Sequence, residues 1–490
     1  MARKVIDRAL APLSRTDAER LLPRLPKSPI REAEKLLRGR CLRLVESFEP
    51  AWNEITALAV TAKDPRIRAR AQIELVYLAY YLVHPDEGDL AAAAAEPIAA
   101  DDPLMLADLH IARSVLATGS DRIADAFKAI AFAQDALRAA PRGRGRDLTD
   151  GALQRQLAHL HVHSANYAAA REAARAAERL ARRTGDAWES RWAVYVRGFA
   201  EWAAGDLEAA RRALTRAERS LRGSGSSLWR WTLYCLAAVE AELGFPSRAV
   251  TLAQRSGYGT KDALAYLALR TGDLDAATTM LGSSSPVADA TAQAVRGLVL
   301  CESGERREGL RALEDARVRF SGAGLAHDAL ACALHWAYWQ ERARRGSGAP
   351  AARAAFSKIV DAGGEGFKWY DARVARWLVP VARRHHPAVA EKMTRRAMSV
   401  LERASPERSR TSALRPEALR ERGLTDREVG IVVALRERTD VDRDGLARRL
   451  GMSPNTLRVH LTRIRSKLGV GAARGDTAIL AAARGQETSR

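Results

Sequence analysis

A short segment near the carboxyl end of the chain carries side chains whose chemistry and spacing suit contact with DNA. At 100° per residue, a helix over Pro454–Leu468 gathers short polar side chains on one face, with cations beside them. Asn455, Val459, Thr462 and Ser466 lie near the centre of this face, Arg458 and Arg463 flank it, and Thr456, His460 and Lys467 lie toward one side. Such a face fits the floor of a major groove between walls of phosphate.

The charge of the chain is concentrated in the same segment. Residues 445–475 contain no Asp or Glu but seven basic residues. The whole chain has a net charge of +20 and a pI near 10.3, which indicates a polyanionic partner, nucleic acid first and an anionic membrane surface second. Residues 408–490 contribute +8 of that charge. The remaining basic charge is either spread over solvated helix faces or forms a surface that holds DNA nonspecifically.

The expected helix has signals that fix its start and its buried side. Ser453 is a favoured N-cap residue, and Pro454 is a favoured first residue of a helix. An apolar stripe with helical spacing runs opposite the polar face, at Leu457, Leu461, Ile464 and Leu468. We expect this stripe to pack on two preceding helices.

Two shorter helices are predicted just before it. The first opens at a capping box formed by Thr425 and Glu428. The second begins near Asp442 and ends at Gly451, a residue suited to the left-handed conformation of a helix end. The residues expected to be buried are Ile431, Val432, Ala434 and Leu435 in the first helix and Leu446, Ala447 and Leu450 in the second. A turn of three residues leads from Gly451 to the third helix.

The stretch SPNTLRVHLTRIRSKLGV, Ser453–Val470, resembles the recognition helix of LuxR-type helix-turn-helix regulators. The matching residues are Thr456, His460, Leu461, Ile464, Lys467, Leu468, Gly469 and Val470. The resemblance covers about 424–483. It implies a four-helix DNA-binding domain over 424–490, in which a last helix at about 476–484 supports a homodimer on double-stranded DNA. The chain departs from the family in a longer loop at 436–441, which lacks a glycine, and in Gly445, which replaces an acidic residue.

The resemblance also gives roles to the polar face. Arg458 matches a position that faces bases and is the candidate for a guanine contact, and Val459 is the candidate for a thymine methyl contact. Together with the geometry of the helix, this predicts base contacts from Asn455, Arg458, Val459 and Thr462. Phosphate contacts are predicted from Thr456, His460, Arg463, Ser466 and Lys467.

Residues 1–403 are predicted to be an all-α array of helical repeats, joined to the DNA-binding domain by a mobile tether at 404–423. The segment Arg197–Glu218 returns at Arg296–Ala316 with its glycines, leucine and alanine in register. At Gly198, Ala210, Leu214 and Ala217 the segment resembles tetratricopeptide repeats, and this resemblance is clearest over 152–316. The fold class is therefore an α-solenoid followed by a helix-turn-helix domain.

Weaker copies of the repeat are expected on both sides of Arg197–Glu218. In them Asn166–Tyr167, Gly244–Phe245 and Gly272–Asp273 take the place of Gly205–Asp206 at the turn between two helices. Small residues after each turn let antiparallel helices approach closely. We interpret the tryptophans of this region as helix-packing residues, with an aromatic groove for a peptide as the alternative.

Several other kinds of site are not expected. No Lys follows a Gly, so the phosphate-binding loop of nucleotide-binding ATPases is missing, and no GxGxxG motif follows a strand. His159 and His163 share a helix face but have no third ligand nearby, and Cys41, Cys235, Cys301 and Cys332 lack metal-site spacing. We expect no metal, no cofactor, no catalysis and no membrane span. The scattered cysteines fit a reducing, cytoplasmic compartment, where DNA binding would associate the protein with a bacterial nucleoid.

Three functions fit these features. The first is a transcription regulator whose repeats bind a protein, a peptide or a small effector, or self-associate. The second is a repeat-based scaffold or adaptor with a degenerate helix-turn-helix. The third is a sigma-factor-like subunit, which the absence of a second recognisable promoter-binding region disfavours.

Overall fold

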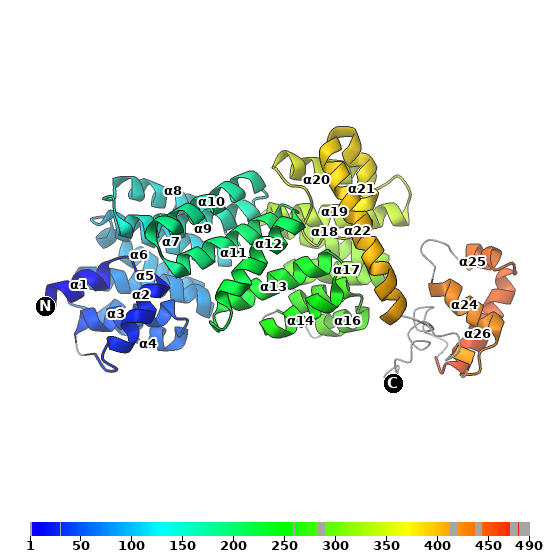
Figure 1. Ribbon diagram of the computed structural model, residues 1–490, viewed down its shortest axis with the longest axis horizontal. Helices are drawn as coiled ribbons and strands as arrows, with labels where there is room; N and C mark the ends of the chain where they lie inside the picture. Colours follow the sequence, from blue (N-terminus) through cyan, green and yellow to red (C-terminus); the bar gives the residue numbers. More distant parts are fainter. Residues whose placement is uncertain are drawn as a thin grey trace. The chain divides into compact units, whose positions relative to one another are not determined.

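The computed structural model describes residues 2–29, 31–257, 260–282, 290–411, 419–420, 422–436, 443–470 and 479. Within these ranges every regular element is a helix and none is a strand, which confirms the predicted all-α class. The chain divides into two compact units, 1–398 and 399–490 (Figure 1). We call them the repeat unit and the terminal unit; the helix α22, Pro387–Thr411, begins in the first and ends in the second.

Helices follow one another along the repeat unit with short turns between them. Their bounds are α1 Ala2–Leu10, α2 Arg15–Leu21, α3 Glu32–Leu44, α4 Phe48–Thr61, α5 Pro65–Leu82, α6 Pro85–Ala99, α7 Pro103–Gly119, α8 Ile123–Ala139, α9 Arg144–His163, α10 Tyr167–Thr184, α11 Ala187–Ala203, α12 Leu207–Leu221, α13 Ser227–Glu242, α14 Pro246–Ser256, α15 Lys261–Thr271, α16 Leu274–Gly282, α17 Ala290–Ser303, α18 Arg306–Gly322, α19 Ala326–Ala343, α20 Ala349–Asp361, α21 Ala372–His385 and α22 Pro387–Thr411. The terminal unit contains α24 Asp426–Arg436, α25 Arg443–Arg449 and α26 Pro454–Lys467.

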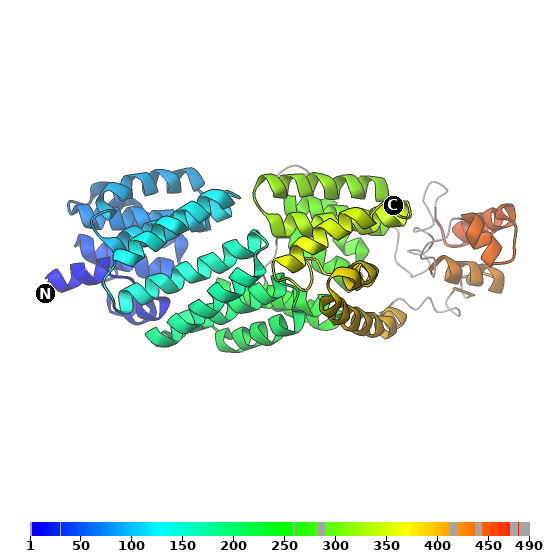
Figure 2. The same cartoon turned by 90° about the horizontal axis from the view of Figure 1, so that it is seen from above.

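Consecutive helices of the repeat unit pack as pairs. α7 packs against α8, α9 against α10, α11 against α12 and α17 against α18, and each pair also packs on the next one. Figures 1 and 2 show these pairs stacked one after another within the repeat unit. The arrangement is the tetratricopeptide-like α-solenoid that the sequence predicts.

The turn within a pair has a recurring geometry. Gly205 has φ +80°, and the N–H groups of Gly205 and Asp206 donate to carbonyls in the last turn of α11. Asp206 then caps α12 by accepting from the N–H of Ala209. Glycines with positive φ recur in the turns of later pairs at Gly244, Gly272 and Gly304, and Gly324 takes the same conformation between α18 and α19. Because each such turn closes the carbonyl end of one helix and starts the next, the chain reverses direction within two or three residues.

One turn has a different register from the predicted one. The sequence predicts that Asn166–Tyr167 takes the place of Gly205–Asp206, but in the structure Ala165–Asn166 occupies that place. Ala165 adopts the left-handed conformation with φ +57°, and Asn166 caps α10 as Asp206 caps α12. The asparagine belongs at the cap because its side chain must accept from a backbone N–H of the next helix.

The repeated glycine of the two matching segments is a packing position. A Cβ on Gly198 would lie 2.7 Å from Cγ of Leu214, and a Cβ on Gly297 would lie 2.8 Å from Cγ of Leu313. In both pairs the leucine of the second helix therefore sits against the bare backbone of the first. The spacing of glycine and leucine in the sequence sets how closely α11 and α12, and α17 and α18, approach.

A loop late in the repeat unit packs against much earlier helices. The N–H of Ala168 donates to the carbonyl of Ala362 at 3.1 Å, and the N–H of Glu365 donates to the carbonyl of Ala204 at 2.6 Å. The aromatic side chains of this loop are buried, at Phe367, Trp369 and Tyr370. The loop ties the end of the solenoid to α10 and to the turn after α11.

The predicted tether at 404–423 is described at 404–411, 419–420 and 422–423, and its remaining residues lie outside the described ranges. Residues 404–411 continue α22. Leu419 is buried in the core of the terminal unit, and the N–H of Leu424 donates to its carbonyl at 3.1 Å. Both ends of the tether thus join regular structure.

Two further expectations concern side chains and membranes. All four cysteines are buried, and none forms a disulfide. Of the tryptophans in the repeats, only Trp231 is exposed, which agrees with the interpretation that they pack between helices. Within the described ranges, no helix combines the length and apolar character needed to span a bilayer.

Candidate nucleic-acid interface

The first helix of the terminal unit starts as the sequence predicts. The N–H of Glu428 donates to Oγ1 of Thr425 at 3.3 Å, and the N–H of Thr425 donates to Oε2 of Glu428 at 2.8 Å. These reciprocal bonds form the predicted capping box. The helix then buries Ile431, Val432, Ala434 and Leu435.

The second helix ends in a tight turn that leads into the third. Gly451 has φ +62°, the N–H of Gly451 donates to the carbonyl of Arg448, and the N–H of Met452 donates to the carbonyl of Ala447. This pair of bonds is a Schellman motif. Leu446 and Ala447 are buried, as predicted, and Leu450 packs partly buried against the same core. The turn confirms the short connection between the two helices of the predicted motif.

The third helix, α26, begins at the predicted residues. Oγ of Ser453 accepts from the N–H of Thr456 at 3.1 Å, and Pro454 is the first residue of the helix. α26 packs against both α24 and α25. Leu457, Leu461 and Ile464 are buried in the core, with Leu468 partly buried beside them. The apolar stripe thereby fixes which face of α26 is left open.

The opposite face of α26 is open to solvent. The structure exposes eight of the nine predicted contact residues, and His460 is partly exposed. The eight are Asn455, Thr456, Arg458, Val459, Thr462, Arg463, Ser466 and Lys467. Val459 is 44% exposed, although most valines avoid water, because it lies between polar neighbours on the side away from the core. A methyl-bearing side chain flanked by polar groups is suited to contact with another apolar group such as a thymine methyl.

Two hydrogen bonds order this face. Nη2 of Arg458 donates to Oδ1 of Asn455 at 2.8 Å, and Oγ1 of Thr462 donates to the carbonyl of Arg458 at 3.0 Å. The first bond holds the guanidinium group beside the start of the helix. The guanidinium group of Arg458 is exposed, and its planar fork suits a bidentate contact with a ligand.

Not all of the predicted phosphate contacts are equally available. Thr456 is exposed, and its hydroxyl shares a 2.7 Å hydrogen bond with Ser453. His460 is only partly exposed, and its Nδ1 is buried with no hydrogen-bond partner among the described residues. Arg463 and Ser466 are exposed. Of the predicted cations on this side of the helix, Arg463 is therefore open to a phosphate.

Lys467 has a partner that sequence reasoning missed. Its Nζ lies 2.7 Å from Oε2 of Glu428, whose side chain is only 3% exposed, while that of Lys467 is 35% exposed. Burial opposes the ionisation of Glu428, but hydrogen bonds from Lys467 and Thr425 outweigh it and hold its pKa below the ordinary value. The ion pair joins the end of α26 to the start of α24. The signal in the sequence is the pairing of Glu428, in the capping box of α24, with Lys467, the only lysine of α26.

Some predicted features fall outside the described residues. These are most of the loop at 436–441 and most of the expected final helix at 476–484. Ile479 is the described residue of that expected helix, and it is buried in the core of the terminal unit.

The histidines considered for a metal in the repeat unit are packing residues. The ring of His159 stacks on Phe199 with a centroid distance of 5.0 Å, and burial lowers the pKa of His159 to about 3. His159 is therefore neutral at physiological pH. In the part of the chain that the structure describes, no group of three or more His, Cys, Asp or Glu side chains could hold a metal ion.

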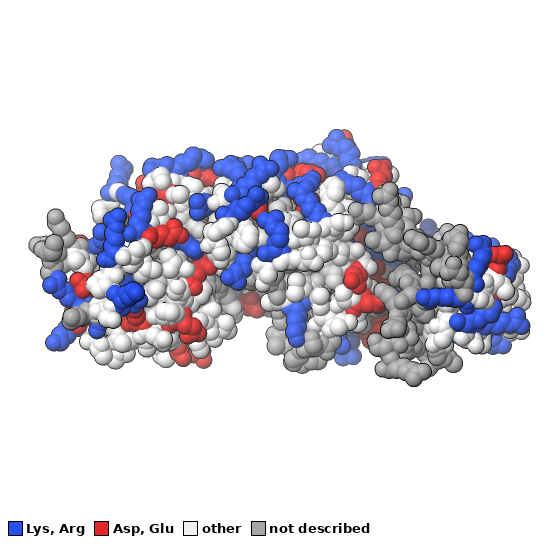
Figure 3. All heavy atoms as spheres, turned by 60° about the horizontal axis from the view of Figure 1, so that its bottom comes forward, with Lys and Arg blue, Asp and Glu red and all other residues white. Residues whose placement is uncertain are grey.

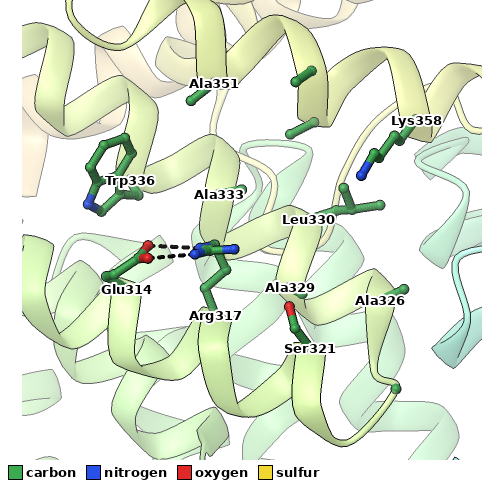
Figure 4. A pocket seen from close by; sticks show the side chains of 13 residues that line it. Glu314, Arg317, Ser321, Ala326, Ala329, Leu330, Ala333, Trp336, Ala351 and Lys358 are labelled. Carbon is green, nitrogen blue, oxygen red and sulfur yellow. Dashed lines mark hydrogen bonds and ion pairs between the residues drawn. The ribbon is translucent and has the colours of Figure 1, made fainter.

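A groove of about 570 Å³ lies between α18, α19 and α20 (Figure 4). Its apolar lining consists of alanines together with Leu330 and Trp336. Trp336 lies at one end and Lys358 at the other. Arg317, at the edge, is held by two hydrogen bonds to Glu314 of 2.8 and 2.5 Å. A groove of this size can hold a small molecule or part of a peptide.

Comparison with known proteins gives only distant likenesses in fold. No protein-family model matches the chain, and no curated protein matches it. Among solved structures, a Rap protein complexed with competence and sporulation factor has 11% identity and a TM-score of 0.41 over 77% of this chain and 99% of its own. The apo form of the quorum sensor NprR from B. thuringiensis has 10% identity and a TM-score of 0.42 over 68% of this chain and 97% of its own.

A third similar structure comes from an archaeon. The signal transduction ATPase PH0952 from Pyrococcus horikoshii, described as having a tetratricopeptide repeat sensor, has 13% identity and a TM-score of 0.35 over 71% of this chain and 52% of its own. At these identities and TM-scores no functional residue carries over to this chain. The class of protein, a helical-repeat protein, rests on its own helix pairs.

Proposed function

We propose that the chain is a sequence-specific DNA-binding transcription regulator, in which the helix Pro454–Leu468 lies in the major groove. One observation carries the proposal: α26 buries one apolar stripe and leaves an ordered, acid-free face of polar, apolar and basic side chains exposed. A helix that served only the fold would not need Val459 in water beside a positioned arginine.

The chemistry of this face supports base reading. The guanidinium fork of Arg458 can donate to O6 and N7 of a guanine, and the methyl groups of Val459 can contact a thymine methyl. Asn455 and Thr462 can exchange hydrogen bonds with neighbouring bases, while Arg463 and Ser466 face a phosphate wall. Binding to DNA, and no catalysis, is the proposed activity, in the cytoplasm and in association with a nucleoid.

We propose that the repeat unit controls or oligomerises the DNA-binding domain, and that the protein acts as a homodimer on DNA. Stacked helix pairs offer long surfaces for a protein, a peptide or a small effector. The groove lined by Trp336 and Lys358 supports such binding, because an apolar lining with a lysine at one end orients an amphipathic ligand.

Selection of the full-length protein against a random duplex library tests the proposal. We expect enrichment of one motif. Arg458→Ala should weaken the selected site by about 1–3 kcal/mol and relax one base preference, since the lost contact is to a base. Arg463→Ala is the matched control, because loss of a phosphate contact should weaken all sequences alike. If no motif is enriched, the adaptor interpretation with a degenerate helix-turn-helix replaces this one.

A sigma-factor-like subunit is distinguished by the same selection followed by a partner test. Such a subunit would select its motif only in the presence of core RNA polymerase. Selection by the isolated protein supports the regulator.

A further inference from the structure

Two neighbouring helices of the repeat unit carry an arginine face. Both α10 and α12 pack against α11, and each is the second helix of its pair. Arg175 and Arg179 on α10, and Arg212, Arg216 and Arg219 on α12, are all exposed. On each helix these arginines fall within about 60° of one another, opposite the buried alanines and leucines. We call these five residues the arginine face.

None of the five guanidinium groups forms a hydrogen bond or an ion pair with another residue that the structure describes. Some other exposed cations of the repeat unit do form ion pairs. On α8, Lys128 pairs with Asp125 and Arg138 pairs with Asp135. Glu218 on α12 is engaged elsewhere, since it binds Arg222 and Arg255. Glu172 and Glu208 are exposed on the same helices but form no ion pair with these arginines within the described residues.

The arginine face disfavours the free protein. Arg175 and Arg179 are four residues apart, as are Arg212 and Arg216, and like charges at this spacing repel one another on a helix. Lysines and arginines are common on solvated helix faces, but here five arginines without an ion pair among the described residues lie on the second helices of two successive pairs. Figure 3 shows Lys and Arg side chains gathered along the upper edge of the repeat unit in that view. An external anion would relieve the repulsion.

The chemistry of the face selects a polyanion with closely spaced charges. Arg212 and Arg219 are separated by about 10 Å along the helix, from a rise of about 1.5 Å per residue. Duplex DNA carries one negative charge per about 1.7 Å of its axis, so several phosphates fit this length. The planar guanidinium group binds phosphate with two parallel hydrogen bonds.

We propose that the arginine face of α10 and α12 binds the phosphate backbone of duplex DNA, as a sequence-independent site separate from the recognition helix. This inference rests on the proposed function for its choice of DNA over other polyanions. The site adds affinity and salt dependence without adding base preference. It also accounts for part of the positive charge that lies outside 408–490.

The test compares two full-length variants with the same net charge. The first replaces all five arginines of the face by Gln. The control replaces five exposed cations elsewhere in the repeat unit, as R20Q, R24Q, K27Q, K35Q and K63Q. Binding to a long mixed-sequence duplex is measured by fluorescence anisotropy at several salt concentrations. Circular dichroism confirms that both variants keep the helical content of the parent.

Counterion release sets the expected size of the effect. Each lost phosphate contact reduces the slope of log K against log salt by about 0.9, so five contacts give a ceiling of about 4.5. We expect the face variant to lose at least about two units of slope and the control to lose less than about one. A face variant whose slope matches that of the control overturns the inference.

Two further arms separate this inference from the proposed function and from other partners. Loss of motif selection in Arg458→Ala, with no change of slope in the face variant, would support the recognition helix and reject the arginine face. If the face variant has a reduced slope but the parent selects no motif, the result supports the arginine face and rejects the recognition helix. Binding to vesicles of phosphatidylcholine with phosphatidylserine, or to single-stranded RNA, is the final comparison. If the face variant loses either of these more strongly than it loses duplex DNA, the assignment to DNA is wrong.

Discussion

Replacement of Lys467 by Met separates two roles that this residue could have. The sequence predicts a phosphate contact, whereas the structure holds its Nζ 2.7 Å from the buried carboxylate of Glu428. In the first role the substitution weakens DNA binding and leaves the fold unchanged. In the second role it loosens the packing of α26 on α24.

The contacts give the size of the structural effect. A hydrogen bond between charged groups contributes about 1.5–3 kcal/mol when it is buried. Lys467 is 35% exposed, so solvent screening reduces the contribution to about 1–2 kcal/mol. Glu428 keeps its bonds to Thr425, which limits the cost of leaving its carboxylate without the lysine. The equilibrium of local opening should therefore shift by about 5- to 30-fold.

Hydrogen exchange measured by mass spectrometry on the full-length protein reports this opening directly. We expect Lys467→Met to lower the protection of α24 and α26 by that factor and to leave the repeat unit unchanged. Arg463→Met is the matched control. Arg463 is exposed and has no partner among the described residues, so its removal should leave protection intact and lower the salt dependence of DNA binding by about 0.9 in slope.

The same pair predicts a pH dependence. The pKa of Glu428 in the folded protein lies below its ordinary value of 4.5. The stability that this shift contributes is complete above pH 4.5 and is lost as the pH falls through the folded pKa. Protection of α24 in the parent should fall in that acidic range, and less so in Lys467→Met. If Lys467→Met weakens DNA binding with no change in the protection of α24 or α26, the structural role is refuted.

Three other perturbations follow from the packing. Gly198→Ala should destabilise the repeat unit by about 1–2 kcal/mol, because overpacking against Leu214 outweighs the better helix propensity of alanine. Thermal unfolding measures this change. The control is Gly322→Ala, whose new Cβ meets no neighbour within 4 Å and which should not lower the Tm. Burial raises the pKa of Glu242 to about 7, so the folded state binds an extra proton between the ordinary value and about 7, and stability should fall as pH rises through this range. Glu242→Gln should flatten that pH dependence, and an unchanged slope would contradict the assignment. Thr425→Ala removes one bond of the capping box and should cost about 1 kcal/mol in the local stability of α24, seen as faster hydrogen exchange there.

The local structure of the terminal unit could be predicted because its signals are local. Ser453 caps the helix that follows it, Gly451 takes a left-handed conformation, and Thr425 pairs with a residue three positions away. Each involves a backbone group within a few residues, so the sequence specifies it without knowledge of the rest of the chain.

Two features of the chain, the burial of Leu419 and the register of the turn at Asn166, have no local signal in the sequence. Two prolines and several small polar residues predict a mobile linker over 404–423, and Leu419 within this segment is buried in the core of the terminal unit. One leucine in a polar stretch does not reveal which core will receive it. Asn166 was likewise placed one residue early in the turn, because Ala165 carries no sign that it adopts a positive φ.

The sequence by itself determined the helical class, the helix pairs, the caps and the exposed face of α26, because these follow from periodicity and from bonds between near neighbours. Only the tertiary structure decided which charges are free to act. Lys467 and Arg463 look alike in the sequence, but one faces the buried Glu428 and the other faces solvent. The arginines of α10 and α12 differ from the cations of α8 in the same way. A charge is available only when no partner lies within a few ångströms, and partners distant in sequence meet only in the fold.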